Sequence, residues 1–208
     1  RRKAIACVVK KYRLWLIDDD IYGFLNQGQH QALYNLIPER CFSVVSLSKA
    51  VLPGLRIGFI YGPASHTQQL NRHIRANIWM CSGLSLAIMA RLWQQKSLTK
   101  MMQKQITEAQ QRQKILREVL GEWQVETQLR SFHCWLYLPA QWSSERFRQA
   151  AKSQGVIVSS SPYFRVDKQH PPSAVRLSLM APTSQKVLRQ GLVILSALLK
   201  KQPTSATQ

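Results

Sequence analysis

Acidic side chains are scarce in this sequence. It has ten Asp and Glu residues against 29 Lys and Arg residues, so its net charge is +19. A positive field of this size attracts polyanions, and a basic nucleic-acid-binding module is therefore one hypothesis for the chain. The basic residues are scattered, however, and scattered charge is more often the solvated surface of helices. The net charge is the only feature that supports this hypothesis.

The sequence also lacks a long apolar run. No segment approaches the roughly 20 apolar residues of a membrane-spanning helix. The apolar stretch at residues 4–9 is too short for a secretory signal, and no small-residue cleavage site follows it. We therefore expect a soluble, cytoplasmic protein with no membrane partner.

No CxxC pair occurs among the four cysteines, which are Cys7, Cys41, Cys81 and Cys134. Their wide spacing favours neither a metal site nor a disulfide framework. We expect no metal in this protein, and free cysteines suit a reducing compartment.

Short apolar runs near the start of the chain predict strands of a sheet. Residues 1–11 have the apolar spacing of a helix, and the runs at 14–17, 42–46 and 56–61 follow. Their lack of alternation is typical of strands buried on both faces of a parallel or mixed sheet. We interpret residues 1–65 as the C-terminal part of a larger α/β domain, because three strands are few for an open sheet.

The next segment, residues 66–123, is nearly free of glycine and proline. Apolar residues recur in it at spacings of three and four, which predicts a helical connector. Residues 124–208 alternate between strand and helix patterns and predict a small C-terminal α+β domain. Its expected elements are strands at 134–138, 156–158 and 175–179 and helices at 144–153 and 183–200.

Three of the ten acids stand together as Asp18, Asp19 and Asp20 after an apolar run. Adjacent carboxylates repel one another, so a shared cation or proton donor would explain the cluster. Ligands of open α/β sheets bind at the carboxyl ends of the strands, where this cluster is expected. A helix N-cap acid with solvated neighbours is the alternative interpretation.

A second polar cluster surrounds Lys49, between two predicted strands. Ser46 and Ser48 precede the lysine, and Arg56 follows it across a Pro-Gly turn. A lysine amine attacks carbonyl groups when its surroundings lower its pKa. An arginine fork and serine hydroxyls bind phosphate well, so the cluster predicts a phosphate site beside a reactive lysine. The alternative is a surface turn with incidental basic residues.

Together the segments LIDDDIYGFL at 16–25, SLSK at 46–49 and PGLRIG at 53–58 resemble the cofactor signature of class I/II aminotransferases. The resemblance is closest to the aminotransferase-like domains of MocR-type regulators of the GntR family, and it continues to about Leu199. It implies a fold type I, pyridoxal-phosphate-dependent transferase-like α/β fold. The chain would contain the end of the large mixed-sheet domain and a small α+β C-terminal domain.

The resemblance also implies roles for individual residues in binding pyridoxal 5′-phosphate. Lys49 would hold the cofactor as a Schiff base and move the proton during transamination. Asp19 would pair with the pyridine nitrogen, and Tyr22 would donate to the phenolic oxygen. The phosphate would be held by Ser46, Ser48 and Arg56.

Two further expectations follow from the same resemblance. Arg176 would bind the α-carboxylate of the amino acid substrate. Asp18 and Asp20 have no ligand role, and we expect one of them to face away from the cofactor and to pair with a base.

Two functions share this chemistry. The first is transamination between an amino acid and a 2-oxo acid. The second is an amino-acid-sensing effector domain of a transcriptional regulator, with little or no turnover. The resemblance implies a homodimer in the full-length protein, and contact with DNA only through an upstream winged-helix domain. We also expect residues 1–208 alone to bind the cofactor weakly, because the glycine-rich phosphate loop of such proteins precedes the aspartate.

Overall fold

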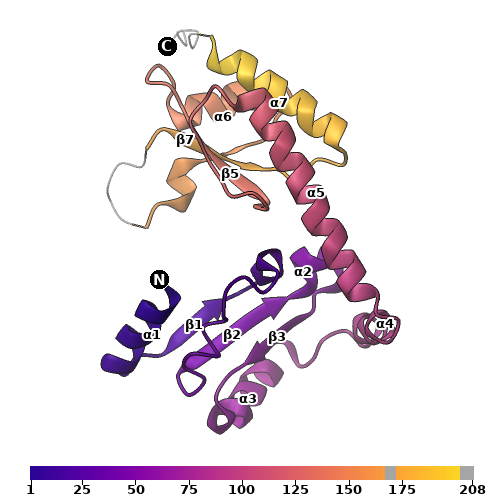
Figure 1. Ribbon diagram of the computed structural model, residues 1–208. Helices are drawn as coiled ribbons and strands as arrows, with labels where there is room; N and C mark the ends of the chain where they lie inside the picture. Colours follow the sequence, from indigo (N-terminus) through magenta and orange to yellow (C-terminus); the bar gives the residue numbers. More distant parts are fainter. Residues whose placement is uncertain (167–171, 202–208) are drawn as a thin grey trace. The chain divides into compact units, whose positions relative to one another are not determined.

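The structure is a computed structural model that describes residues 1–166 and 172–201 (Figure 1). By its internal contacts the chain divides into two units, Arg1–Gln105 and Ile106–Gln208. Each unit has a sheet of its own. The boundary falls within one long helix, α5 (Ser97–Leu120).

The first unit contains a three-stranded sheet in the order β1-β2-β3. Strands β1 (Leu16–Asp19) and β2 (Cys41–Ser46) are parallel, and β3 (Gly58–Tyr61) pairs with β2 in the antiparallel direction. The short α2 helix (Leu47–Ala50) follows β2 directly. Three 3-10 turns complete the connections: η1 (Gly23–Asn26), η2 (Pro53–Leu55) and η3 (Ala64–His66).

Helix α1 (Arg2–Lys11) buries one apolar side against the sheet. Ala6 and Val9, three positions apart, pack with Leu33, Ile37 and Cys41 in one apolar cluster. This spacing places both side chains on one helix face, and the helix predicted for residues 1–11 is confirmed.

The first strand begins later than the predicted range 14–17. The Leu14 N–H still bonds to the Val9 carbonyl at 3.0 Å, and Arg13 has a φ of 52° as the chain leaves the helix. Residues 14 and 15 are therefore the exit from α1, and the two acids Asp18 and Asp19 belong to the strand itself.

The prediction that these strands are buried on both faces is wrong for the described residues. All four residues of β3 are exposed, and Ile17 of β1 is 72% exposed. Strand β2 lies in the middle of the order and contains the buried residues Cys41 and Ser43. The outer strands each have one strand neighbour among the described residues, which leaves apolar side chains uncovered.

The helical region predicted for residues 66–123 consists of three helices. They are α3 (Thr67–Ile78), α4 (Gly83–Gln94) and α5. The breaks fall near Trp79 and Lys96, which have φ values of 62° and 54°. Among the described residues, none of these helices or the others combines the length and apolar character needed to cross a bilayer.

The second unit contains a four-stranded antiparallel sheet in the order β4-β5-β7-β6. Its strands are β4 (Val125–Glu126), β5 (His133–Tyr137), β6 (Ser159–Ser160) and β7 (Ala174–Ser178). Helices α6 (Ser144–Ser153) and α7 (Gln185–Leu199) and the C-terminal half of α5 supply apolar residues to the core. A 3-10 turn, η4 (Ser161–Phe164), follows β6.

Strand alternation separates the two faces of this sheet. Cys134 and Leu136 of β5 and Val175 and Leu177 of β7 belong to the core with the three helices. Successive side chains of a strand point to opposite faces. Trp135 and the other alternate residues of these strands therefore lie on the face away from this core, and we call it the open face.

The strand predicted at 156–158 is not formed. Val156 and Val158 pack against the core, but the ladder with β7 is made by Ser159 and Ser160. The apolar run at 156–158 correctly predicted buried residues, but the strand itself begins at Ser159.

Arg112 of α5 holds the connection between β7 and α7. Its side chain is 6% exposed and donates to the carbonyls of Leu179 and Pro182 at 2.7 and 2.8 Å. It also pairs with Glu108 at 2.6 Å, and Glu108 accepts from Gln185 of α7 at 2.9 Å. A buried guanidinium is tolerated because these acceptors satisfy it.

Candidate functional site

Three segments of the first unit meet at one edge of its sheet. β1 and β2 are parallel, with Asp19 opposite Val44, so their carboxyl ends lie at the same edge. β3 is antiparallel to β2 and begins with Gly58 opposite Ser46, so the turn before β3 lies at this edge too. The residues that follow Asp19, those that follow Ser46 and those that precede Gly58 are thereby brought together. We call this place the carboxyl edge.

The serines at the end of β2 tie two of these segments to each other. The Ser46 hydroxyl caps α2 by accepting from the Ser48 N–H at 3.1 Å, and the two hydroxyl oxygens are 3.0 Å apart. The carbonyl of Ile57 accepts from the Ser46 hydroxyl at 3.2 Å and from the Leu47 N–H at 3.1 Å. The residue after Arg56 is therefore bonded directly to the start of α2.

Arg56 stands at this junction with an exposed side chain and a φ of 52°. This left-handed conformation is costly for a residue with a Cβ. Ser46 and Ser48 lie beside the junction, so hydroxyls and a guanidinium belong to one local structure.

Lys49 lies in α2, and its side chain is exposed. The two residues that follow it, Ala50 and Val51, are buried in a cluster with Leu55 and Ile57. Packing of these neighbours therefore fixes the backbone at Lys49, while the lysine side chain itself remains exposed.

Asp18 and Asp19 of β1 have different surroundings. The Asp18 side chain is 12% exposed, and its Oδ2 lies 3.8 Å from Arg2 Nη1. Asp19 is exposed, and its Oδ1 accepts from the Ile21 N–H at 3.2 Å. Because strand residues alternate, the two carboxylates point to opposite faces. The expectation that one acid of the cluster pairs with a base elsewhere is confirmed for Asp18.

Asp20 occupies a tighter place just after β1. Burial, and to a smaller extent the charge of Asp18, raises the pKa of Asp20 above the usual carboxyl range. A Cβ at Gly23 would lie 2.1 Å from the Asp20 carboxylate, so any other residue at position 23 would force the Asp20 side chain to move. The Gly23 N–H bonds to the Asp20 carbonyl at 2.8 Å, which starts the η1 turn that contains Tyr22 as its N-cap.

Arg176 belongs to the second unit, whereas the other six predicted site residues belong to the first. It lies on the open face of β7, opposite Trp135 of β5 and Ser159 of β6. Its guanidinium lies over the ring of Phe164, with the central carbon 5.0 Å from the ring centroid. This ring contact could not be predicted from the sequence, since it depends on a turn twelve residues away.

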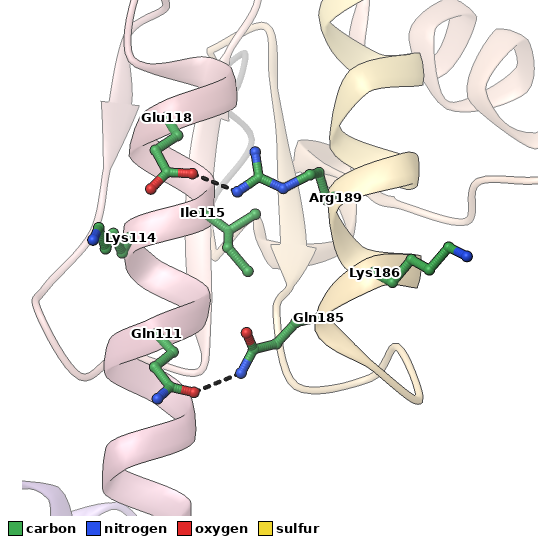
Figure 2. A pocket seen from close by; sticks show the side chains of 7 residues that line it. All are labelled: Gln111, Lys114, Ile115, Glu118, Gln185, Lys186 and Arg189. Atoms are coloured by element: carbon green, nitrogen blue, oxygen red, sulfur yellow. Dashed lines mark hydrogen bonds and ion pairs between the residues drawn. The ribbon is translucent and has the colours of Figure 1, made fainter.

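A shallow hollow of the second unit lies between α5 and α7 and contains none of the predicted residues (Figure 2). Arg189 pairs with Glu118 across it, and Gln185 donates to Gln111 at 2.6 Å. These side chains satisfy one another's hydrogen bonds, so we interpret the hollow as part of the packing interface between α5 and α7. Its lining residues are Gln111, Lys114, Ile115, Glu118, Gln185, Lys186 and Arg189.

Known proteins resemble the chain along most of its length. The model of the family described as aminotransferase class I and II matches residues 2–195. The chain is 30% identical over 199 residues to YdeF of Bacillus subtilis, an uncharacterized HTH-type transcriptional regulator, and this covers 95% of the chain and 43% of the regulator. It is 34% identical over 98 residues to the mitochondrial kynurenine/α-aminoadipate aminotransferase of Rattus norvegicus, which covers 45% of the chain and 23% of the enzyme.

Solved structures agree in fold. An archaeal alanine:glyoxylate aminotransferase superposes with a TM-score of 0.85 at 22% identity, covering 96% of this chain and 51% of that one. The kynurenine aminotransferase of Pyrococcus horikoshii gives a TM-score of 0.84 at 19% identity and the same coverage of 96% and 51%. The chain thus spans about half the length of these proteins. It belongs to the class I and II aminotransferase family and has the fold of type I pyridoxal-phosphate enzymes.

Proposed function

We propose that this chain binds pyridoxal 5′-phosphate and transfers the amino group of an amino acid to a 2-oxo acid. The observation that supports this proposal is the carboxyl edge, where the strand end of Asp19, the helix of Lys49 and the turn of Arg56 meet. The donor set fits the cofactor, because an amine, a carboxylate, two hydroxyls and a guanidinium match its aldehyde, its ring nitrogen and its phosphate. Aminotransferases of this family use this cofactor.

The cofactor, when bound, supplies a ring that withdraws electrons from the substrate Cα. Lys49 Nζ would hold the cofactor covalently until the amino group of the substrate displaces it, and the freed amine would then take the proton from that carbon and deliver it to the former aldehyde carbon. The Asp19 carboxylate favours a protonated ring nitrogen, since a nearby negative charge stabilises the cation. The Tyr22 hydroxyl donates to the phenolic oxygen.

The phosphate in this proposal is held by Arg56 and by the Ser46 and Ser48 hydroxyls. A guanidinium binds phosphate through two parallel hydrogen bonds, which fixes orientation as well as adding attraction. The capping bonds of the serines order these hydroxyls before a ligand arrives. Arg176 binds the α-carboxylate of the amino acid by the same forked geometry.

A second candidate function is supported by YdeF, the regulator that the chain matches over 95% of its length. In this role the same site binds cofactor and an amino acid as an effector, with little or no turnover. DNA would be bound by a winged-helix domain upstream of residue 1.

In either role we propose a homodimer. The segment from α3 to α4 exposes large apolar side chains, and contiguous exposed apolar surface marks interaction sites. The residues concerned are Ile78, Trp79, Met80, Leu84 and Trp93, each of which is more than 60% exposed.

Absorbance of bound cofactor tests the proposal. Purified protein incubated with pyridoxal phosphate should gain a near-ultraviolet to visible band that borohydride removes by fixing the cofactor to the chain. Lys49→Ala should abolish the covalent attachment, whereas Lys11→Ala, an exposed lysine of α1, should keep it. Attachment that persists in Lys49→Ala would refute the assignment of the lysine.

Turnover then separates the two candidate functions. Amino acid consumption by the full-length protein above the rate of free cofactor supports the enzyme. DNA binding that changes with an amino acid, without turnover, supports the regulator.

A further inference from the structure

The Arg176 side chain contains a buried nitrogen that has no hydrogen-bond partner among the described residues. Its Nε is buried and makes no hydrogen bond within the part of the chain that the structure describes. Arginine presents five N–H donors in a planar fork, and a buried donor without an acceptor is costly. A planar carboxylate that bridges Nε and a terminal nitrogen would satisfy this donor.

Two aromatic side chains surround this guanidinium on the open face. Phe164 presents its ring face at 5.0 Å from the guanidinium carbon. Trp135, the cross-strand neighbour of Arg176, meets the Phe164 ring edge to face, with centroids 5.5 Å apart and planes at 80°. Phe164 is 41% exposed, so the ring remains outside the apolar core.

An arginine side chain has many rotamers, and stacking on a ring restricts the plane of the guanidinium. The ring quadrupole attracts the cation, and it does so without using any of the N–H donors, which lie in the guanidinium plane. Trp135 in turn restricts the rotation of Phe164, since an edge-to-face pair has a preferred geometry. The arrangement orients the fork and leaves its donors for a ligand.

We propose that Phe164, supported by Trp135, is a positioning residue that orients Arg176 to receive the carboxylate of the amino acid through Nε and a terminal nitrogen. This inference rests on the proposed function, in which Arg176 binds that carboxylate. It adds that the turn η4 contributes to ligand affinity through a residue that makes no hydrogen bond to the ligand.

Substitution of the ring tests this role in the full-length protein loaded with cofactor. Phe164→Leu should weaken binding of an amino acid by about 2- to 10-fold, the range of one cation–π contact. Phe164→Tyr keeps the ring face and should bind like the wild type. Tyr163→Leu is the matched control, because it removes the adjacent ring, which is 72% exposed.

The readout is the spectral change of the cofactor on titration with an amino acid and with the primary amine that lacks its carboxylate. Phe164→Leu should weaken binding of the amino acid and leave the amine unchanged. In an Arg176→Gln background the same substitution should have no further effect on the amino acid. Equal weakening of both ligands would overturn the positioning role, because it would indicate a general structural effect.

Failure of this inference can be told apart from failure of the proposed function. If the wild-type protein shows no absorbance band of bound cofactor, the proposed function itself is refuted. A normal band, with an amino acid affinity that Arg176→Gln lowers and Phe164→Leu does not, removes only the role of Phe164.

Discussion

Residues next to each other in β1 have separate tasks, because a strand directs them to opposite faces. Asp18 faces Arg2, whereas Asp19 is exposed at the carboxyl edge and accepts from the Ile21 N–H; in the proposed function its carboxylate pairs with the ring nitrogen of the cofactor. In Asp19→Asn the ring nitrogen loses its charged partner, and a partner of this kind shifts a pKa by about one to three units. We therefore expect turnover to fall by about 10- to 1,000-fold while the absorbance of bound cofactor remains. Asp20→Asn is the control, and an equal loss there would argue against the assigned acid.

Asp20 predicts a dependence of stability on pH. A raised pKa means that the folded chain binds the proton more tightly than the unfolded chain, so this contribution is present at low pH and is lost as the pH rises through the raised value. The carboxylate is thus unfavourable at neutral pH. Asp20→Asn should raise the unfolding temperature at about pH 7, and the gain should vanish near about pH 3. A gain that is the same at both values would contradict this origin.

For single residues, the sequence was enough to identify candidate site residues, but it did not show which other side chains they contact. Lys49, Ser46 and Ser48 stood out because their chemistry matches a phosphorylated aldehyde, and the structure places them at one sheet edge with the strand end of Asp19. The contact between Phe164 and Arg176 was missed, since it depends on where the η4 turn lies relative to β7. The alternation of side chains along β5 could have shown that Trp135 lies on the same face of the sheet as Arg176.

Among the elements, the joint between β7 and α7 depends on one side chain of α5. Arg112→Met would leave the carbonyls of Leu179 and Pro182 and the Glu108 carboxylate without their donor. Hydrogen bonds to charged groups contribute about 1.5–3 kcal/mol, so we expect a loss of at least this size in the free energy of unfolding. Denaturant titration measures it. Arg117→Met, an exposed arginine of the same helix, should change it far less.

Element positions could be predicted from the sequence where local signals agree with burial. The helix at 144–153 was placed correctly, and Ser143 caps it by accepting from the Arg146 N–H. β6 was misplaced because an apolar run reports burial, whereas a ladder depends on the neighbouring strand. The helix breaks at Trp79 and Lys96 were missed because ordinary residues adopt a conformation that sequence analysis expects of glycine.

For the whole molecule, the proposed homodimer predicts that a charge placed on the apolar surface of α4 weakens self-association. Leu84 is 74% exposed, so Leu84→Lys should leave the fold intact. If this surface is the dimer contact, a buried charge there should weaken self-association by about tenfold or more. Sedimentation at several protein concentrations measures this. Gln68→Lys, on the exposed surface of α3, is the control, and equal behaviour of the two variants would count against a dimer through α4.

The left-handed backbone at Arg56 affects two properties in opposite ways. An arginine in this conformation lowers the stability of the fold, and the same side chain serves the proposed binding of phosphate. Glycine adopts this conformation without steric conflict, but it has no guanidinium to bind the phosphate in the proposed function. Arg56→Gly should therefore relieve the backbone strain at this position and, in the proposed function, weaken the binding of the phosphate.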